Sequence, residues 1–196
     1  MGIEITAIDV RIEELSLPAF AGAAGFLQRT GPINAALLGL YAGPVIGGAV
    51  AAYNVIAEMP GTVTMTDTNN MVHNVIDRLQ LFRKLNAKRN MSRLNILDHG
   101  NGKAMQIGGD TVDDTNIDSF AKILSLLKGN FDRDGFVHLQ HCEIGQNEKL
   151  LAAFARIVNV PVYAGTGYHN GVMRANTGQY VRAHPSGTID RNVGRP

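Results

Sequence analysis

Apolar positions along the chain follow two periods, one typical of strands and one typical of helices. Short runs rich in apolar or β-branched residues predict strands at residues 62–67, 94–97, 135–141 and 160–164. Between these runs, apolar residues recur at helical spacing over residues 72–85, 117–127 and 146–158. Regular alternation of strand and helix is typical of a mostly parallel sheet covered by helices. The sequence therefore predicts an α/β fold with a mostly parallel sheet.

The N-terminal part of the chain has a different pattern. Residues 3–12 alternate in hydrophobicity and predict an edge strand or a short arm. Residues 31–57 carry no charge and contain glycines spaced by four positions, which places them on one face of a helix. Pro44 interrupts this stretch, so we expect two short helices there rather than one long helix.

Two interpretations of residues 31–57 stay open. In the first, the segment is a hairpin buried against the domain or in an interface between copies of the chain, because an uncharged surface favours self-association. In the second, it enters a membrane, since its length suffices to span a bilayer, or it contacts a chaperone. We divide the chain into an N-terminal arm with an apolar, glycine-rich helical segment (residues 1–60) and an α/β domain (residues 61–196).

The amino-acid composition mainly excludes classes of partner and of site. The 196 residues include 18 Lys and Arg against 17 Asp and Glu, a net charge of +1, which argues against a general binder of polyanions. We therefore expect no nucleic-acid partner. Cys142 is the one cysteine, which excludes an internal disulfide framework and any site built from several cysteines. The first residues form no basic segment, so we expect a cytoplasmic protein or one delivered without a conventional secretory signal.

Chemically notable residues follow three of the predicted strands. His99 and Gly100 come directly after the second strand, and Cys142 comes directly after the third. A glycine-rich loop that begins at Gly165 follows the fourth. In open parallel sheets, ligands bind in the crevice outside the carboxyl ends of the strands. We therefore expect these three loops to converge on one edge of the sheet.

A histidine and a single cysteine at two strand ends predict nucleophilic catalysis. Such catalysis needs a thiol beside a base, together with N–H groups that stabilise an oxyanion. His99 would supply the base, Cys142 the nucleophile and the N–H of Gly100 an oxyanion donor. We also expect N–H groups of the loop near residue 146 to favour the thiolate. The alternative interpretation is that Cys142 is a buried and unreactive small side chain.

The neighbouring titratable residues have other expected roles. His138 shares the parity of Cys142 along the strand and is expected to be buried, whereas His141 points to the opposite face and is a poor base for the thiol. A metal site made from these three residues would be crowded on one strand and would lack a fourth ligand, so we expect no metal. Asp98 orients His99, recognises a basic group of the substrate, or simply forms part of the turn at the end of the strand.

Two blocks of the sequence resemble a known family. Residues 94–100 (LNILDHG) and 136–142 (FVHLQHC) are similar to the two blocks of the caspase–gingipain–separase superfamily of cysteine peptidases, in which one apolar strand ends in His-Gly and a later one ends in Cys. Residues 99–108 resemble more closely an uncharacterised caspase-like domain of large bacterial surface proteins. They also resemble, more distantly, the self-cleaving protease domains of large bacterial toxins. The similarity covers about residues 61–171.

The resemblance implies a three-layer α/β sandwich of the caspase type and hydrolysis of a peptide or amide bond through a thioester. Cys142 is then the nucleophile, His99 is the acid and base, and the N–H groups of Gly100 and Cys142 form the oxyanion hole. No metal or organic cofactor is needed. The sequence departs from the family on both sides of the nucleophile, at His141 and Glu143. The residues we expect to bind the substrate are Asp98, His141, Glu143, Thr166, Tyr168 and His169.

We expect a peptide or protein substrate and a role as a bacterial effector or toxin protease, with peptidoglycan peptides as an alternative substrate class. Two hypotheses from other classes remain. In one, the domain is catalytically silent and only binds a ligand in the cleft at the strand ends. In the other, the protein is membrane-active through residues 31–57, and the α/β domain is a carrier.

Overall fold

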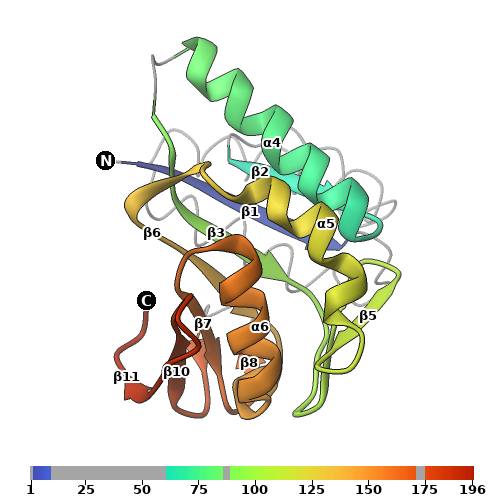
Figure 1. Ribbon diagram of the computed structural model, residues 1–196, viewed down its shortest axis with the longest axis vertical. Coiled ribbons are helices and arrows are strands. Elements are labelled where there is room, and N and C mark those ends of the chain that lie inside the picture. Colours follow the sequence, from blue (N-terminus) through green and yellow to red (C-terminus); the bar gives the residue numbers. More distant parts are fainter. Residues whose placement is uncertain (1, 10–60, 86–88, 171–174) are drawn as a thin grey trace, which may run out of the picture.

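The computed structural model of the protein describes residues 2–9, 61–85, 89–170 and 175–196. The strands of its central sheet are β1 (Ile3–Asp9), β2 (Thr62–Met65), β3 (Met91–Leu97), β6 (Phe131–Gln140), β7 (Val162–Gly165), β10 (Tyr180–Ala183) and β11 (Ile189–Val193). Their order across the sheet is β11-β10-β7-β6-β3-β1-β2 (Figure 1). All neighbours from β2 to β7 are parallel, whereas β10 and β11 are antiparallel to their neighbours. The predicted α/β class with a mostly parallel sheet is confirmed.

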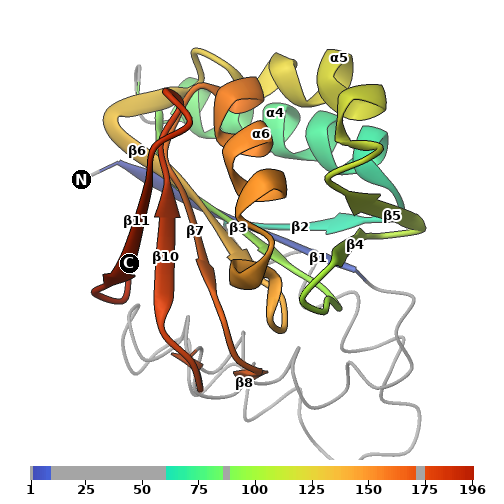
Figure 2. The same ribbon diagram turned by 60° about the horizontal axis from the view of Figure 1, so that its bottom comes forward.

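The described helices lie on one face of this sheet. α4 (Thr68–Leu85), α5 (Ala121–Leu124) and α6 (Glu148–Val158) are on the same side of the strands in Figure 2. α4 packs on β1 and β2, and α6 packs on β7 and β10. The smaller elements are the 3-10 turns η2 (Ile117–Phe120), η3 (Ser125–Leu127) and η4 (Ile144–Gln146), the hairpin of β4 (Ala104–Ile107) and β5 (Asp110–Asp113), and the pair β8 (His169–Asn170) and β9 (Ala175–Asn176).

The two faces of the sheet differ in polarity. Successive side chains of a strand point to opposite faces, so residues paired across the sheet share a face. One such row belongs to the apolar core and consists of Val63, Ala7, Ile96, Leu139, Ala164 and Val181. The adjacent row on the other face consists of Thr62, Thr6, Asn95, His138, Tyr163 and Arg182. The core therefore lies between the sheet and the helices on the apolar face.

β1 corrects the prediction for the N-terminus. Residues 3–9 pair in parallel with β2 on one side and with β3 on the other. This strand is therefore internal, not an edge strand or an arm, and Ile5 and Ala7 are fully buried. It belongs to the same sheet as the strands that follow residue 61. The apolar segment 31–57 lies outside the described residues.

α4 contains the helical spacing predicted over residues 72–85 and begins four residues earlier, at Thr68. Asp67 precedes its first residue, and the Asp67 Oδ1 atom accepts the N–H of Asn70 at 2.8 Å, which is the usual N-cap bond. The helix expected over residues 117–127 is instead one α-turn between two 3-10 turns. The hydroxyls of Ser119 and Ser125 donate to carbonyls three residues earlier, at 2.7 and 2.8 Å, and such bonds compete with regular helix.

The remaining elements agree only partly with the sequence pattern. Residues 104–107 form the short strand β4. β10 and β11 were not anticipated, because their residues show neither a long apolar run nor a clear alternation. Within the described ranges, no helix combines the length and hydrophobicity that crossing a membrane requires.

Candidate active site

The carboxyl ends of β3 and β6 bring His99 and Cys142 to the same edge of the sheet. These strands are parallel neighbours, and Leu97 is paired with Gln140. His99 and Cys142 each follow this pair by two residues, on strands whose backbones run about 4.8 Å apart. The two loops therefore meet, as the position of both residues at strand ends predicts.

Glycines allow the loops at this edge to touch. A Cβ atom on Gly100 would lie 2.8 Å from Cβ of His141 and 3.1 Å from the carbonyl oxygen of Cys142. A Cβ atom on Gly145 would lie 2.7 Å from the carbonyl carbon of Gly165, at the end of β7. Any larger residue would push these backbones apart, so the glycines hold all three loops in contact.

Gly100 keeps its N–H outside the neighbouring hairpin. It forms an isolated antiparallel bridge with Met105 of β4. The hydrogen bonds of this bridge, both 2.9 Å long, come from the residues on either side of Gly100. In that pattern the residue between them directs its own N–H away from the partner strand. The N–H of Gly100 therefore points away from β4, as an oxyanion donor must.

The thiol of Cys142 is half-buried and accepts a hydrogen bond from the backbone. The donor is the N–H of His169, 3.4 Å from Sγ, and so belongs to β8 rather than to the turn near residue 146. Directly after the cysteine, Glu143 adopts a left-handed backbone conformation with φ 57°. Its N–H donates to the carbonyl of Gly167 at 2.7 Å. A left-handed residue other than glycine is uncommon, and here it turns the chain sharply behind the thiol.

Asn176 fastens the loop that carries His169. Its Oδ1 atom accepts the N–H groups of Gly167 and Gly178, each at 2.8 Å. Its Nδ2 atom donates to the carbonyl of Gly167 at 2.7 Å. One amide side chain thus joins the turn after β7 to the turn before β10. This junction holds the segment whose N–H reaches the thiol.

Asn176→Ala is expected to destabilise the fold by about 2 kcal/mol, because partly buried backbone N–H groups lose their acceptor. Urea denaturation followed by circular dichroism measures this loss. Asn130→Ala is the control, since the Asn130 side chain donates one exposed bond to the Leu126 carbonyl at 2.9 Å. That control is expected to cost less than about 1 kcal/mol, and an equal loss in both variants would contradict the prediction.

Asp98 is an interior residue at the end of β3, with 9% of its surface exposed. Its Oδ1 atom accepts the N–H of His99 at 2.7 Å, and its Oδ2 atom accepts the N–H of Gly108 at 2.8 Å. Burial raises the pKa of this carboxyl from 3.8 to about 6. The N–H of His99 opposes that shift in pKa, the carboxylate of Asp9 adds to it, and the N–H of Gly108 and the His99 side chain also oppose it.

His141 is fully buried, with 0% of its surface exposed. Its Nε2 atom lies 2.8 Å from the carbonyl oxygen of Gln106. A carbonyl only accepts, so Nε2 carries the hydrogen, and Nδ1 of the neutral ring carries none. Burial lowers the pKa of His141 from 6.5 to about 4, the bond to Gln106 opposes this, and the charges of His169 and His99 lower the pKa further. The imidazole of His141 is therefore neutral at pH 7.

The other predicted residues differ in their exposure. His99 is exposed, Gly100 and Cys142 are half-buried, and Tyr168 is 66% exposed. Glu143, Thr166 and His169 are half-buried beside the thiol loop. Asp98 and His141 are expected from the sequence to bind the substrate, but both are interior. Both carboxylate oxygens of Asp98 and the Nε2 atom of His141 bond to backbone groups. Their burial in the described part of the chain points to a role within the fold, whereas the expected contact with substrate stays a prediction. His138 is buried as predicted.

Sequence reasoning missed three residues that shape this site. They are Gln106 and Gly108 of the β4–β5 hairpin, and Asn176. Gln106 and Gly108 act through backbone groups, which leave no signature in the side-chain pattern. The one available signal was a glycine directly after a short strand, which indicates a turn with unusual backbone angles.

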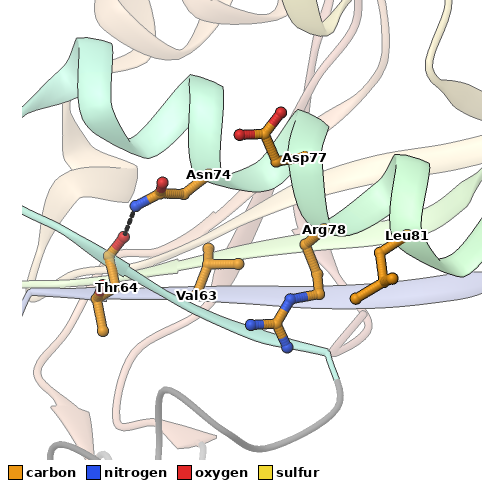
Figure 3. Close-up of a pocket in the computed structure, with 6 residues that line it drawn as sticks. All are labelled: Val63, Thr64, Asn74, Asp77, Arg78 and Leu81. Carbon is orange, nitrogen blue, oxygen red and sulfur yellow. Dashed lines mark hydrogen bonds between the residues drawn. The ribbon is translucent and has the colours of Figure 1, made fainter.

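Other parts of the described chain do not extend this site. Among the described residues, no group of three His, Cys, Asp or Glu side chains is arranged to hold a metal ion. A pocket of ≈ 310 Å³ lies between β2 and α4 (Figure 3) and is lined by Val63, Thr64, Asn74, Asp77, Arg78 and Leu81. The side chain of Asn74 donates to the carbonyl of Thr64 at 2.9 Å across it. β1 and β3 separate β2 from β6, so this pocket is distinct from the Cys142 site.

Comparison with protein-family models matches residues 45–176 of the chain to a domain of unknown function (DUF4347). The match includes the loops of His99, Cys142 and His169. A search among curated proteins found none that matches this chain.

Proposed function

Because the chain belongs to the DUF4347 family, domains of unknown function, and because its sheet brings a histidine and its one cysteine to the same edge, we propose that it is a cysteine hydrolase that cleaves peptide or amide bonds. The observation that carries this proposal is the register of β3 and β6, which puts His99 and Cys142 two residues beyond paired positions. The N–H bonded to the thiol supports it further, because a donor at the sulfur stabilises the thiolate that attacks.

The proposed reaction has two steps. In the first, Sγ of Cys142 attacks the carbonyl carbon of the substrate while His99 takes the thiol proton. The oxyanion forms against the N–H groups of Gly100 and Cys142, and it collapses to a thioester as His99 returns the proton to the leaving amine. In the second step, water attacks the thioester, which releases a carboxylic acid and restores the thiol. The atoms balance with water as the only co-substrate.

The fold and the order of the two residues support a caspase-like domain. A strand that ends in His-Gly and a later parallel neighbour that ends in Cys are the features that resemble the caspase–gingipain–separase superfamily. The three-layer arrangement of that superfamily is part of this proposal. The exposed Tyr168 and the half-buried Glu143, Thr166 and His169 surround the thiol loop and are the proposed contacts to a peptide substrate. A bacterial effector or toxin protease is the proposed biological role.

Alkylation of Cys142 by iodoacetamide tests the proposal without knowledge of the substrate. The chain has one cysteine, so the intact mass reports the reaction of this thiol alone. His99→Ala is expected to slow alkylation at pH 6.5 by about tenfold or more, because the thiol loses its base. His73→Ala removes an exposed histidine of α4 and is the matched control. It is expected to leave the rate unchanged.

A rate that is indifferent to His99 would contradict the proposed dyad. It would favour the second candidate, a binding module in which Cys142 is unreactive. The half-burial of the thiol and its bond to a backbone N–H are compatible with that alternative as well. The third hypothesis, membrane activity through residues 31–57, concerns residues outside those that the structure describes.

A further inference from the structure

We propose that Asp98 and His141 are positioning residues that anchor the His99 loop and the Cys142 loop on one short hairpin, β4–β5. Each of them directly precedes the reactive residue that it would hold. This inference rests on the proposed function. For Asp98 it develops the orienting role that the sequence also offers, and for both residues it is an alternative to contact with the substrate. The hairpin then acts as a common support that sets the distance between the Cys142 thiol and the His99 imidazole.

Asp98 ties the His99 loop to the turn of the hairpin. One of its carboxylate oxygens accepts the N–H of His99, and the other accepts the N–H of Gly108, at 2.7 and 2.8 Å. Gly108 lies between β4 and β5 and has a left-handed backbone, with φ 58°. Both oxygens are occupied by backbone donors in a buried place, where a missing partner would be costly. The carboxylate therefore connects two segments ten residues apart.

His141 ties the Cys142 loop to the same hairpin through Gln106. The imidazole donates from Nε2 to the carbonyl of Gln106 at 2.8 Å. The N–H of this same residue donates to the carbonyl of His99 at 2.9 Å. The backbone of Gln106 is thus bonded to both loops at once. These two hydrogen bonds connect the His99 loop and the Cys142 loop through a single residue of β4.

The hairpin is itself fastened to the rest of the domain. Gly109 donates its N–H to the carbonyl of Thr66 at 2.7 Å, at the end of β2. The Asp110 carboxylate accepts the N–H of Thr68, the first residue of α4, at 2.8 Å. The apolar side chains of the hairpin, Met105, Ile107 and Val112, are buried in the core. Because the hairpin is fixed in this way, it fixes the position of the loops that are bonded to it.

The bulk of His141 explains a departure from the related peptidases. In the peptidases that the sequence resembles, the residue before the nucleophile is usually small, whereas here His141 packs its Cβ against Gly100 and its imidazole reaches across to β4. The Nε2–H tautomer of the neutral ring is the form that donates to a carbonyl. A ring that stays neutral in the interior therefore suits a fixed structural bond and not proton transfer.

The test compares two replacements of His141. Leucine cannot donate to the Gln106 carbonyl, whereas glutamine carries an amide N–H near the place of Nε2. For the wild type and for each variant at position 141, the Cys142 alkylation rate is measured with His99 present and again with His99→Ala added. The quantity compared is the ratio of these two rates. We expect a ratio of about ten in the wild type, about one in His141→Leu, and recovery toward ten in His141→Gln. If His141→Leu does not fold, His141→Asn, whose amide is too short to reach, replaces it.

Amide hydrogen exchange measured by NMR reads the anchoring without reference to reactivity. His141→Leu is expected to speed exchange of the Gln106 N–H, and Asp98→Ala that of the Gly108 N–H, by about tenfold or more. Asp113→Ala is the control, because the Asp113 carboxylate lies on the same hairpin but binds only its own turn, at Thr115 and Asn116. It is expected to leave both amides protected.

The two readouts separate the two ways of failing. A wild-type ratio near ten that His141→Leu does not change would overturn the positioning role and leave the proposed function intact. Unchanged exchange at Gln106 and Gly108 would overturn the anchoring itself. A wild-type ratio near one would overturn the proposed function, whereas faster exchange in the same variants would still support the anchoring.

Discussion

Asp98→Asn and His141→Gln are expected to change the pH dependence of stability in opposite directions. From pH 7 to pH 4, acidification should favour the wild type over Asp98→Asn by about 2.5 kcal/mol. Over the same range it should disfavour the wild type relative to His141→Gln by about 3 kcal/mol. Because the two contributions nearly cancel in the wild type, only the single variants reveal them.

The direction of the pH effect on stability for Asp98 follows from its raised pKa. The folded chain holds this carboxyl at a pKa of about 6, above its ordinary value of 3.8. The folded state therefore binds the proton more tightly than the unfolded state does. The resulting stabilisation is fully present below about pH 3.8 and is lost as the pH rises through 6. Asparagine does not titrate, and any constant cost of its amide leaves the pH slope unchanged.

For His141 the effect of pH on stability has the opposite direction. The folded chain holds this imidazole at a pKa of about 4, below its ordinary value of 6.5. The unfolded state therefore binds the proton more tightly. The stabilisation from the neutral ring is present above pH 6.5 and is lost as the pH falls toward 4. Glutamine keeps a donor to the Gln106 carbonyl but takes up no proton.

Urea denaturation at several pH values between 7 and 4 measures both effects. Differences between the wild type and each variant remove the contributions of titrating groups that do not interact with the replaced residue. Asn130→Ala, which removes no titrating group and only one exposed bond to the Leu126 carbonyl, is the control and should give a flat difference. Flat differences for Asp98→Asn and His141→Gln as well would contradict the burial of the two side chains as the cause of their shifted pKa values.

Gly108→Ala is expected to destabilise the fold by about 3 kcal/mol or more. Gly108 has φ 58°, a conformation that costs an L side chain free energy. A Cβ atom there would also lie 2.3 Å from the carbonyl carbon of Thr66 and 2.5 Å from the nitrogen of Asp67. These are backbone atoms at the end of β2, so they cannot move aside as a flexible side chain does. The turn must shift, and with it the N–H that Asp98 accepts.

Gly129→Ala separates the clash from the backbone conformation. Gly129 also has a positive φ, 81°, but no atom lies within 4 Å of a Cβ placed there. This variant is expected to cost about 1 kcal/mol, the conformational part alone. Thermal and urea denaturation of both variants provide the comparison. Equal losses at the two positions would show that the contact of Gly108 with β2 is unimportant for stability.

The parts of the site that could be predicted are those encoded by position along one strand. His99 and Cys142 each follow an apolar run, and parallel strands in an α/β fold end at a common edge. The start of α4 at Asp67 was predictable for a similar reason, because an N-cap bond joins residues three apart. Each of these inferences uses neighbours in the sequence and needs no knowledge of partners far away.

The residues whose surroundings the sequence does not reveal are those whose environment depends on distant segments. Asp98 and His141 are polar and adjoin the reactive residues, so a substrate contact is a reasonable expectation from the sequence. Their burial results from the packing of the β4–β5 hairpin over both loops, through bonds to Gly108 and Gln106. Backbone N–H and carbonyl groups are present at nearly every position, so the sequence pattern cannot tell which of them will be used.

The sequence by itself determined the α/β class and the position of His99 and Cys142 at the carboxyl ends of strands, because hydrophobic periodicity and strand ends are local properties. Only the tertiary structure decided that β1 is an internal strand, since lateral pairing with β2 and β3 depends on segments more than fifty residues away. It also decided that the His169 N–H reaches the thiol and that Gln106 is bonded to both loops. These contacts are made by backbone groups brought together in space, which no side-chain pattern specifies.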